Sequence, residues 1–477
     1  MAIIGRLWEK GVVEIAKKAK KMGEDDPRRI IHSLKVGLAL TLVSMFYYFR
    51  PLYDGFGVDA MWAILTVVVV FEFSVGATLG KCLNRMAATL VAGALSVGAH
   101  RMATLSGGIG EPILLASSVF LVAGIVTFMR FYPALKARYD YGLMIFILTF
   151  CLVTVSSYRD NEVLKIAHER LSTVAIGCGT AMAVCVCICP VWMGSELHNS
   201  VANNLEKVGN SLQGFGGEYF GSVEVGQSST AIDKSFLEGY KAVLNSKNTE
   251  ENMANFARWE PCHGKFRFRH PWKQYLKVAT LTRQCAYKVE ALNSYLNAEI
   301  QTPDEIKSKI QEPCTKICSE SGKALKEVAV AMRKWTRSTS AICPHVTFSR
   351  KASEDLKSML KTALWENGYY VLDITPAASV ASHLIGVVSC VEKLAEAANE
   401  LASLAHFNSM EASTVSPEQQ QQPAHLLHQG TVVPVLLVPE ESDQIVITID
   451  NEGPPNLPQI DNNNNNDNNN NNNNNNS

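Results

Sequence analysis

Six apolar stretches follow one another in the first part of the chain, at approximately 34–50, 60–79, 86–105, 112–130, 139–157 and 171–193. Each approaches or reaches the about 20 residues that an α-helix needs to cross the hydrocarbon core of a bilayer. Backbone polar groups inside a bilayer must be paired within their own segment, so these stretches are predicted to be helices. Because only short linkers separate them, the pattern favours a transmembrane bundle over buried helices of a soluble domain.

Beyond residue 195 the apolar positions recur every three or four residues, a pattern typical of helices that bury one face. Three stripes carry it, and their members are Val278, Leu281, Cys285, Val289, Leu292 and Leu296; Leu325, Val328, Met332 and Trp335; and Leu384, Val387, Val391, Leu394, Ala398, Leu401 and Ala405. Prolines mark expected helix starts or breaks at Pro303, Pro313, Pro344 and Pro376. This part of the chain is therefore predicted to be a packed helical domain.

The resulting fold class is an all-α membrane protein, with six transmembrane helices, a helical cytosolic domain and a disordered, asparagine-rich tail. The predicted boundaries are 1–32 for a cytosolic amphipathic segment, 33–194 for the membrane domain, 195–410 for the cytosolic domain and 411–477 for the tail. The first segment has an apolar face followed by lysines, which is typical of a helix lying on a membrane surface, although a plain soluble helix shares the pattern.

The tail is almost entirely asparagine from Asp461 onward, so it has too little apolar area to fold. Two of its stretches, 431–438 and 445–449, are candidate short strands. No chemistry is assigned to the tail.

Basic and acidic residues nearly balance, with 44 Lys and Arg against 45 Asp and Glu and a formal net charge of −1. A generic nucleic-acid binder is excluded, because it needs a basic surplus. Basic residues concentrate in the N-terminal segment and in the second and fourth linkers, so the positive-inside rule places both termini in the cytosol. The sequence lacks the motifs of phosphate-binding loops, zinc proteases and serine hydrolases, so no enzyme activity and no catalytic residue is predicted.

The 12 cysteines lie mostly in apolar runs and are predicted to be reduced, buried thiols rather than a disulfide framework. Cys314 and Cys318 have the spacing of two metal ligands, but a second ligand pair at suitable spacing is missing. No cofactor is predicted.

Charged residues beside the apolar stretches are the candidates for function, because a charge in hydrocarbon is costly and usually faces a cavity or a partner. Lys81 and Arg85 are four residues apart, hence on one helical face, and Arg170 begins the sixth stretch. Cations of this kind attract a dicarboxylate, and arginine holds a carboxylate through two parallel hydrogen bonds. Plain anchoring at the membrane interface is the alternative for all three residues.

Two sets of acidic residues are also candidates. Glu72 lies within the second apolar stretch and is expected to pair with a basic residue or to take part in gating, with direct proton coupling as the alternative. Asp54, Asp160 and Glu162 lie in predicted outer loops, where oxygen ligands suit a hard cation. Solvated loop acids are the alternative reading of these three residues.

Three long motifs are specific enough to indicate a family. They are DPRRIIHSLK at 26–35, WAILTVVVVFEFSVGATLGKCLNR at 62–85, and RWEPCHGKFRFRHPW at 258–272. They resemble the signatures of the plant aluminium-activated malate transporters, and the resemblance covers about residues 20–410.

The resemblance implies an anion channel that passes malate and often inorganic anions such as chloride or nitrate. It also implies a homodimer with six spans per subunit, a pore lined by basic residues, and membrane lipid around it. Arg85 and Arg170 match family positions implicated in conduction, and Lys81 lies one helical turn from the first. Trp259, Glu260 and Pro261 form a motif of the cytosolic domain whose role is either structural or ligand-binding. The plasma membrane is the expected location, with the vacuolar membrane as the alternative, because the motifs are shared by both groups.

Two other functions remain open at this point. A proton-coupled exporter of organic acids would use Glu72 as the coupling group. A non-conducting membrane scaffold would bind partners through residues 195–410.

Overall fold

The computed structural model describes residues 14, 17–18, 20–21, 23–48, 60–108, 110–160, 163–221, 235–297, 302–337, 343–366 and 371–409 of the chain. Contacts divide the chain into two units, 1–415 and 416–477, and all described residues belong to the first. The predictions for the tail and for the apolar face of residues 1–13 therefore lie outside the described residues.

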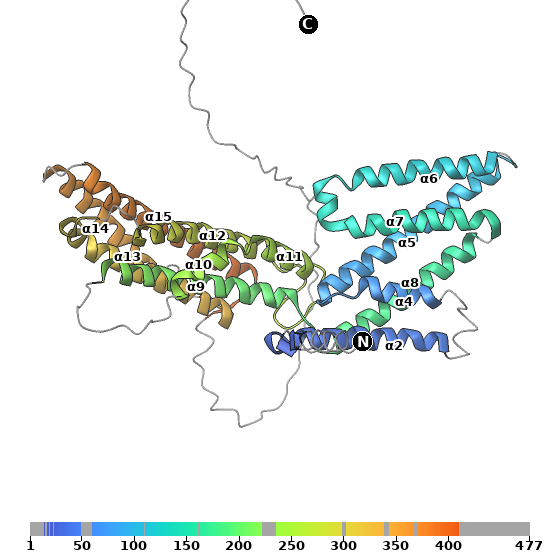
Figure 1. Ribbon diagram of the computed structural model, residues 1–477, viewed down its shortest axis with the longest axis horizontal. Helices are drawn as coiled ribbons and strands as arrows, with labels where there is room; N and C mark the ends of the chain where they lie inside the picture. Colours follow the sequence, from blue (N-terminus) through green and yellow to red (C-terminus); the bar gives the residue numbers. More distant parts are fainter. Residues whose placement is uncertain are drawn as a thin grey trace, which may run out of the picture. The chain divides into compact units, whose positions relative to one another are not determined.

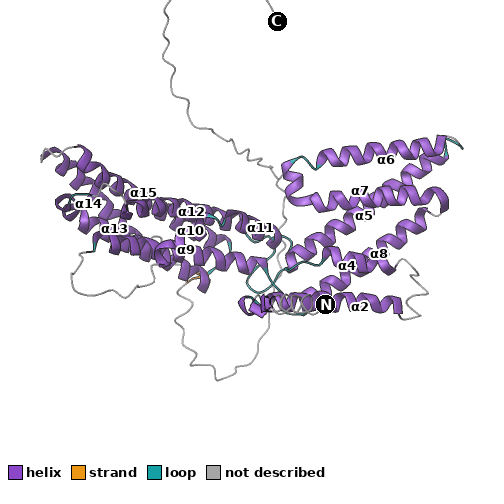
Figure 2. Cartoon of the chain, viewed as in Figure 1, coloured by secondary structure: helices purple, strands orange, loops and turns teal. Residues whose placement is uncertain are grey.

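The first group of described helices contains α2 (Pro27–Tyr48), α4 (Ala60–Val70), α5 (Val75–Thr104), α6 (Gly110–Met129), α7 (Pro133–Asp160) and α8 (Val163–Cys187). All of them except α4 are long and apolar enough to cross a bilayer, α7 through residues 138–156. Helices make up nearly all of the described chain (Figure 2), which confirms the prediction of an all-α membrane protein. We call this group the membrane helices.

The second predicted span, 60–79, is wrong in its extent. Helix α4 ends at Val70 after 11 residues, and α5 begins at Val75. At 1.5 Å per residue α4 is about 17 Å long, which is about half the thickness of a hydrocarbon core. Glu72 therefore lies in a turn rather than in a span, and Lys81 and Arg85 lie inside α5 rather than in a linker.

Helix α5 packs against both α7 and α8 (Figure 1). Small residues permit close approach among the membrane helices, since a Cβ built on Gly177 of α8 would lie 2.7 Å from the Ala63 carbonyl oxygen of α4. A buried apolar cluster joins α2, α4, α5 and α8, and it includes Ala39, Val67, Val75, Cys82 and Cys178.

The second group contains α9 (Met193–Phe220), α10 (Ser235–Leu244), α11 (Lys247–Ala257), α12 (Trp272–Ser294), α13 (Asp304–Lys334), α14 (Pro344–Glu366) and α15 (Val371–Leu404). A 3-10 turn, η2 (Tyr295–Asn297), follows α12, and the strands β1 (Thr336–Arg337) and β2 (Asn408–Ser409) pair in parallel. We call this group the α9–α15 bundle. Its helices share one buried apolar cluster, and the three predicted stripes supply much of it.

Residues 374–404 of α15 are also apolar and long enough to span a bilayer. They pack instead against α12, α13 and α14, so the apolar face of α15 is covered by protein. Pro303 and Pro344 stand at helix starts as predicted, whereas Pro313 and Pro376 lie inside α13 and α15. All twelve cysteines are free, as expected, and eight of them are buried, whereas Cys187, Cys189 and Cys262 are exposed.

Candidate functional site

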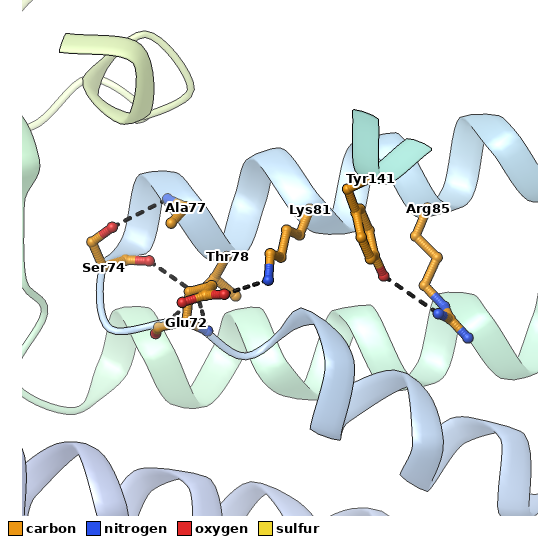
Figure 3. A network of polar contacts seen from close by, with 7 residues as sticks. All are labelled: Glu72, Ser74, Ala77, Thr78, Lys81, Arg85 and Tyr141. Carbon is orange, nitrogen blue, oxygen red and sulfur yellow. Dashed lines mark hydrogen bonds and ion pairs between the residues drawn. The ribbon is translucent and has the colours of Figure 1, made fainter. Parts of the chain in front are cut away.

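The turn between α4 and α5 is fixed by local hydrogen bonds. Ser74 is the N-cap of α5, and its Oγ accepts a hydrogen bond from the Ala77 amide at 3.2 Å. Thr78 Oγ1 accepts from the Glu72 amide at 3.0 Å and lies 3.0 Å from the Ser74 carbonyl oxygen (Figure 3). The Val75 amide donates to the Val191 carbonyl at 3.1 Å, which ties the turn to the segment between α8 and α9.

Glu72 and Lys81 form an ion pair across this turn. The Lys81 ammonium donates to Glu72 Oε1, and both side chains remain more than one-third exposed. The Lys81 Nζ also lies 5.5 Å from the centre of the Tyr141 ring of α7. Figure 3 shows the Tyr141 ring between the side chains of Lys81 and Arg85.

Arg85 is buried among the membrane helices, and no carboxylate of the described residues pairs with it. Its exposed fraction is 6%, and its Nη1 donates to the Tyr141 hydroxyl at 3.3 Å. Its Nε has no hydrogen-bond partner among the described residues. An arginine stays protonated in proteins, so this position keeps a positive charge that no described acidic side chain neutralises.

Arg170 lies on α8, with its guanidinium carbon 3.4 Å from the centre of the Trp62 ring of α4. Stacking of this kind stabilises a cation. Helices α5 and α8 are antiparallel, because Cys82 contacts Cys178 and Gly93 lies beside Ala167. This register places Arg170 about five residues, or about 8 Å, along the axis from Arg85.

The C-terminal end of α5 and the N-terminal end of α8, far from the turn between α4 and α5, border a cavity of about 870 Å³. Its lining includes His100 and Arg101 from α5 and Lys165 and His168 from α8. Basic side chains therefore occur near the turn, in the middle and at the far end of the α5–α8 pair.

The Trp-Glu-Pro motif at 259–261 connects the two groups of helices. Glu260 caps the N-terminus of α9, where its Oε1 accepts from the Met193 amide at 2.5 Å and its Oε2 accepts from the Gly194 amide at 3.1 Å. The Glu260 side chain is only 1% exposed. Burial raises the pKa of Glu260, while the two amide donors at the positive end of α9 act in the opposite direction.

The same motif packs on the first turns of α5. A Cβ built on Gly80 would lie 3.1 Å from Trp259 Cδ1, and one built on Gly76 would lie 2.2 Å from the Phe256 carbonyl oxygen. Only glycine fits at Gly76 without a shift of backbone. The motif therefore contacts the helix that carries Lys81 and Arg85. Its last residue, Pro261, lines a cleft.

His270, in the sequence that follows the motif, belongs to a cluster of aromatic rings in the α9–α15 bundle that also contains His198 and Trp335. His198 Nδ1 lies 2.9 Å from the Tyr275 hydroxyl, its Nε2 lies 2.9 Å from the Met332 carbonyl oxygen, and its ring stacks on Trp335 with centres 4.3 Å apart. Burial lowers the pKa of His198 to about 4, so this histidine is neutral at physiological pH. His270 packs beside Tyr275 with its pKa lowered to about 4 for the same reason.

The acidic candidates for a metal site stay untested. Asp54 and Glu162 lie outside the described residues, as does the side chain of Asp160. In the described part of the chain, no group of three or more His, Cys, Asp or Glu side chains is placed to hold a metal ion.

Sequence reasoning missed Tyr141 and Trp62, which contact Arg85 and Arg170. An aromatic residue in an apolar stretch carries no local signal for such a contact. The spacing of Gly76 and Gly80 was a usable signal for the docking of the Trp-Glu-Pro motif on α5, because small residues four apart mark one helix face that a partner approaches closely.

Comparison with known proteins adds a consistent set of similarities. The family model described as aluminium activated malate transporter matches residues 20–365. The chain is 52% identical over 397 residues to aluminum-activated malate transporter 2 of Arabidopsis thaliana, covering 83% of this chain and 79% of that protein. It is 46% identical over 442 residues to aluminum-activated malate transporter 1 of Arabidopsis thaliana, covering 92% and 88%. It is 45% identical over 407 residues to aluminum-activated malate transporter 1 of Triticum aestivum, covering 83% and 86%.

Proposed function

Because the chain belongs to the aluminium-activated malate transporter family, we propose that it carries malate across a plant membrane as a channel, down the electrochemical gradient of the anion. The family and the long apolar helices make it an integral membrane protein. The proposal includes inorganic anions such as chloride and nitrate as further permeant ions, a homodimer as the working form, and no enzymatic step.

The proposal also includes a membrane domain over 33–194, a cytosolic domain over 195–410, and both termini in the cytosol. The plasma membrane is the proposed location, with the vacuolar membrane as the alternative.

The observation that carries the proposal is the buried charge of Arg85. Burying an unpaired charge in a membrane interior costs at least about 2.5 kcal/mol. A protein can retain such a residue where a permeant anion binds it and offsets this cost. The Tyr141 hydroxyl accepts from Nη1 of Arg85, and Nε of Arg85 has no hydrogen-bond partner among the described residues. A dicarboxylate that reaches Arg85 would complete the hydrogen bonding of the guanidinium.

The proposed path follows the α5–α8 pair. The basic residues Arg85, Arg170 and Lys165 lie along it, and the cavity bordered by His100 and Arg101 is its proposed outer mouth. A series of weakly binding cations suits conduction, since each site must attract the anion and still release it.

The ion pair between Glu72 and Lys81 is proposed to work as a gate. While Glu72 holds Lys81, this lysine is not available to a permeant anion. A partly exposed pair of this kind is worth only about 0–1 kcal/mol, so an arriving dianion can replace the carboxylate. The Trp-Glu-Pro motif, which packs on the same helix at Gly76 and Gly80, is proposed to set the position of this gate from the cytosolic domain.

The test is the reversal potential in cells that express the full chain, with malate varied on one side and pH equal on both. A malate dianion channel is expected to shift the reversal potential by about 30 mV for each tenfold change in malate, as for any two-charge Nernst response. Arg85→Gln is expected to reduce the malate current at equal surface expression. Arg130→Gln is the matched control, because Arg130 already pairs with Asp140 at 2.8 Å, and its current should equal that of the parent chain.

Glu72→Gln separates the gate from proton coupling. The gate predicts an equal or larger malate current, because Lys81 is released. A proton-coupled exporter predicts a lost current and a reversal potential that follows the proton gradient. A surface-expressed chain with no current under any malate gradient would favour the scaffold instead, and a normal current in Arg85→Gln would remove that residue from the path.

A further inference from the structure

A second basic cavity lies where the membrane helices meet the α9–α15 bundle. This cleft has a volume of about 740 Å³ and is separate from the cavity at the far ends of α5 and α8. Its basic lining comes from the start of α7, the end of α11, the loop before α12 and the first turn of α12. It consists of Arg138, Arg258, Arg267, Arg269 and Lys273. We call these five residues the cleft cations.

Within the described residues, no acidic side chain pairs with the basic side chains of the cleft. Glu260 is the acidic residue of the lining, and both of its oxygens are used by the N-terminus of α9. Burial and the nearby charge of Arg138 lower the pKa of Arg258, as expected where two cations lie close together.

The composition of the lining indicates the class of anion. Four of the five cleft cations are arginines, whose planar donors match phosphate oxygens in pairs. Five charges exceed what one dicarboxylate can neutralise, and the volume leaves room for a larger ligand. A group with several phosphates fits both the charge and the space.

The surroundings place this cleft at a membrane surface. Arg138 is the first residue of the apolar stretch of α7, so it is expected where this helix leaves the bilayer. Phe268 is 79% exposed between Arg267 and Arg269 on the rim of the cleft. An exposed aromatic ring flanked by arginines suits the boundary between acyl chains and head groups.

We propose that this cleft binds an anion carrying several phosphates, presented by the head group of a polyphosphorylated membrane lipid or by a soluble phosphate of the same chemistry. The bound group would join Arg138 of the membrane helices to Arg258 and Arg267 of the α9–α15 bundle. It would thereby hold the Trp-Glu-Pro motif against α5. Binding at this cleft does not depend on malate conduction, so it can be tested without measuring a current.

The experiment measures binding to the purified full chain in detergent micelles at fixed salt. The probes are dioctanoyl phosphatidylinositol bisphosphate, inositol trisphosphate, dioctanoyl phosphatidylglycerol and malate. The variant is the double substitution Arg267→Gln with Arg269→Gln. The matched control is Arg333→Gln with Arg350→Gln, which removes the same charge from exposed ion pairs outside the cleft.

We expect the bisphosphate lipid to bind the parent chain and the control equally, and the cleft variant at least about tenfold more weakly, because two charge-assisted contacts are lost. Arg138→Gln, on a different helix, should weaken binding in the same direction. Equal thermal melting of all variants without ligand shows that the fold is retained. Unchanged affinity in the cleft variant and in Arg138→Gln would overturn the proposal, as would malate or phosphatidylglycerol binding as tightly as the bisphosphate lipid.

The source of the phosphates is resolved in the same assay. If inositol trisphosphate binds as tightly as the lipid, the ligand is a soluble phosphate. If Phe268→Ser weakens the lipid but leaves inositol trisphosphate unchanged, the ligand is a lipid. Both results support the phosphate site and differ only in where its ligand resides.

Discussion

Substitution of Gly76 by alanine tests how closely the Trp-Glu-Pro motif docks on α5. The added Cβ would lie 2.2 Å from the Phe256 carbonyl oxygen and 2.9 Å from Glu260 Cγ. Ordinary contacts start near 3.4 Å, so backbone atoms must move by roughly 1 Å in a packed interface. Overpacking of this kind lowers the stability of the fold by about 1–3 kcal/mol, while the better helix propensity of alanine raises it by at most about 1 kcal/mol.

The matched control is Gly98→Ala in the same helix, because a Cβ there meets no atom within 4 Å. We expect Gly76→Ala to lower the melting temperature of the purified full chain by about 2–8 °C relative to Gly98→Ala. The malate current should fall in Gly76→Ala as well, since the motif and the helix that carries Lys81 can no longer meet in the native position. If both variants melt and conduct alike, the close docking of the motif on α5 is refuted.

Two further predictions concern the α9–α15 bundle. Glu260→Gln places an amide nitrogen against the amide donors at the start of α9, and is expected to lower the free energy of unfolding by about 2 kcal/mol in thermal melting. Glu251→Gln, on the exposed face of α11, is the control and should have no measurable effect. Equal melting of the two variants would contradict the cap. His198 has a pKa lowered from 6.5 to about 4, so the unfolded chain binds the proton first as pH falls. Stability should therefore decrease from pH 6.5 toward 4 by up to about 1.4 kcal/mol per pH unit. His198→Gln should reduce this dependence in melting curves without abolishing it, because the pKa of His270 is also lowered to about 4. An unchanged slope would remove His198 as a cause.

The turn at residues 71–74 illustrates what apolar periodicity misses. Residues 62–71 are apolar with one threonine, and the pattern continues beyond Glu72, so hydropathy alone predicts one span over 60–79. The chain turns there because Ser74 caps a new helix and the Val75 amide finds the Val191 carbonyl oxygen, more than a hundred residues away. A cap is a local signal that hydropathy does not contain, and the second contact is not local at all.

The candidate site shows the same limit. The charges of Lys81, Arg85 and Arg170 stand out in the sequence because cations near apolar stretches are costly. Their partners do not stand out, since Glu72 was expected to pair without a named partner, and Tyr141 and Trp62 were not expected to contact cations.

The sequence by itself determined the helical membrane class, the amphipathic faces of the α9–α15 bundle and the family, because burial along one helix leaves a period in its own residues and long motifs identify relatives. Tertiary structure decided where α4 stops, which cation is paired and which is not, and how the Trp-Glu-Pro motif meets Gly76. Those outcomes depend on which distant segments approach within contact distance. That choice is made by packing and hydrogen bonding between helices, and no local pattern in the chain records it.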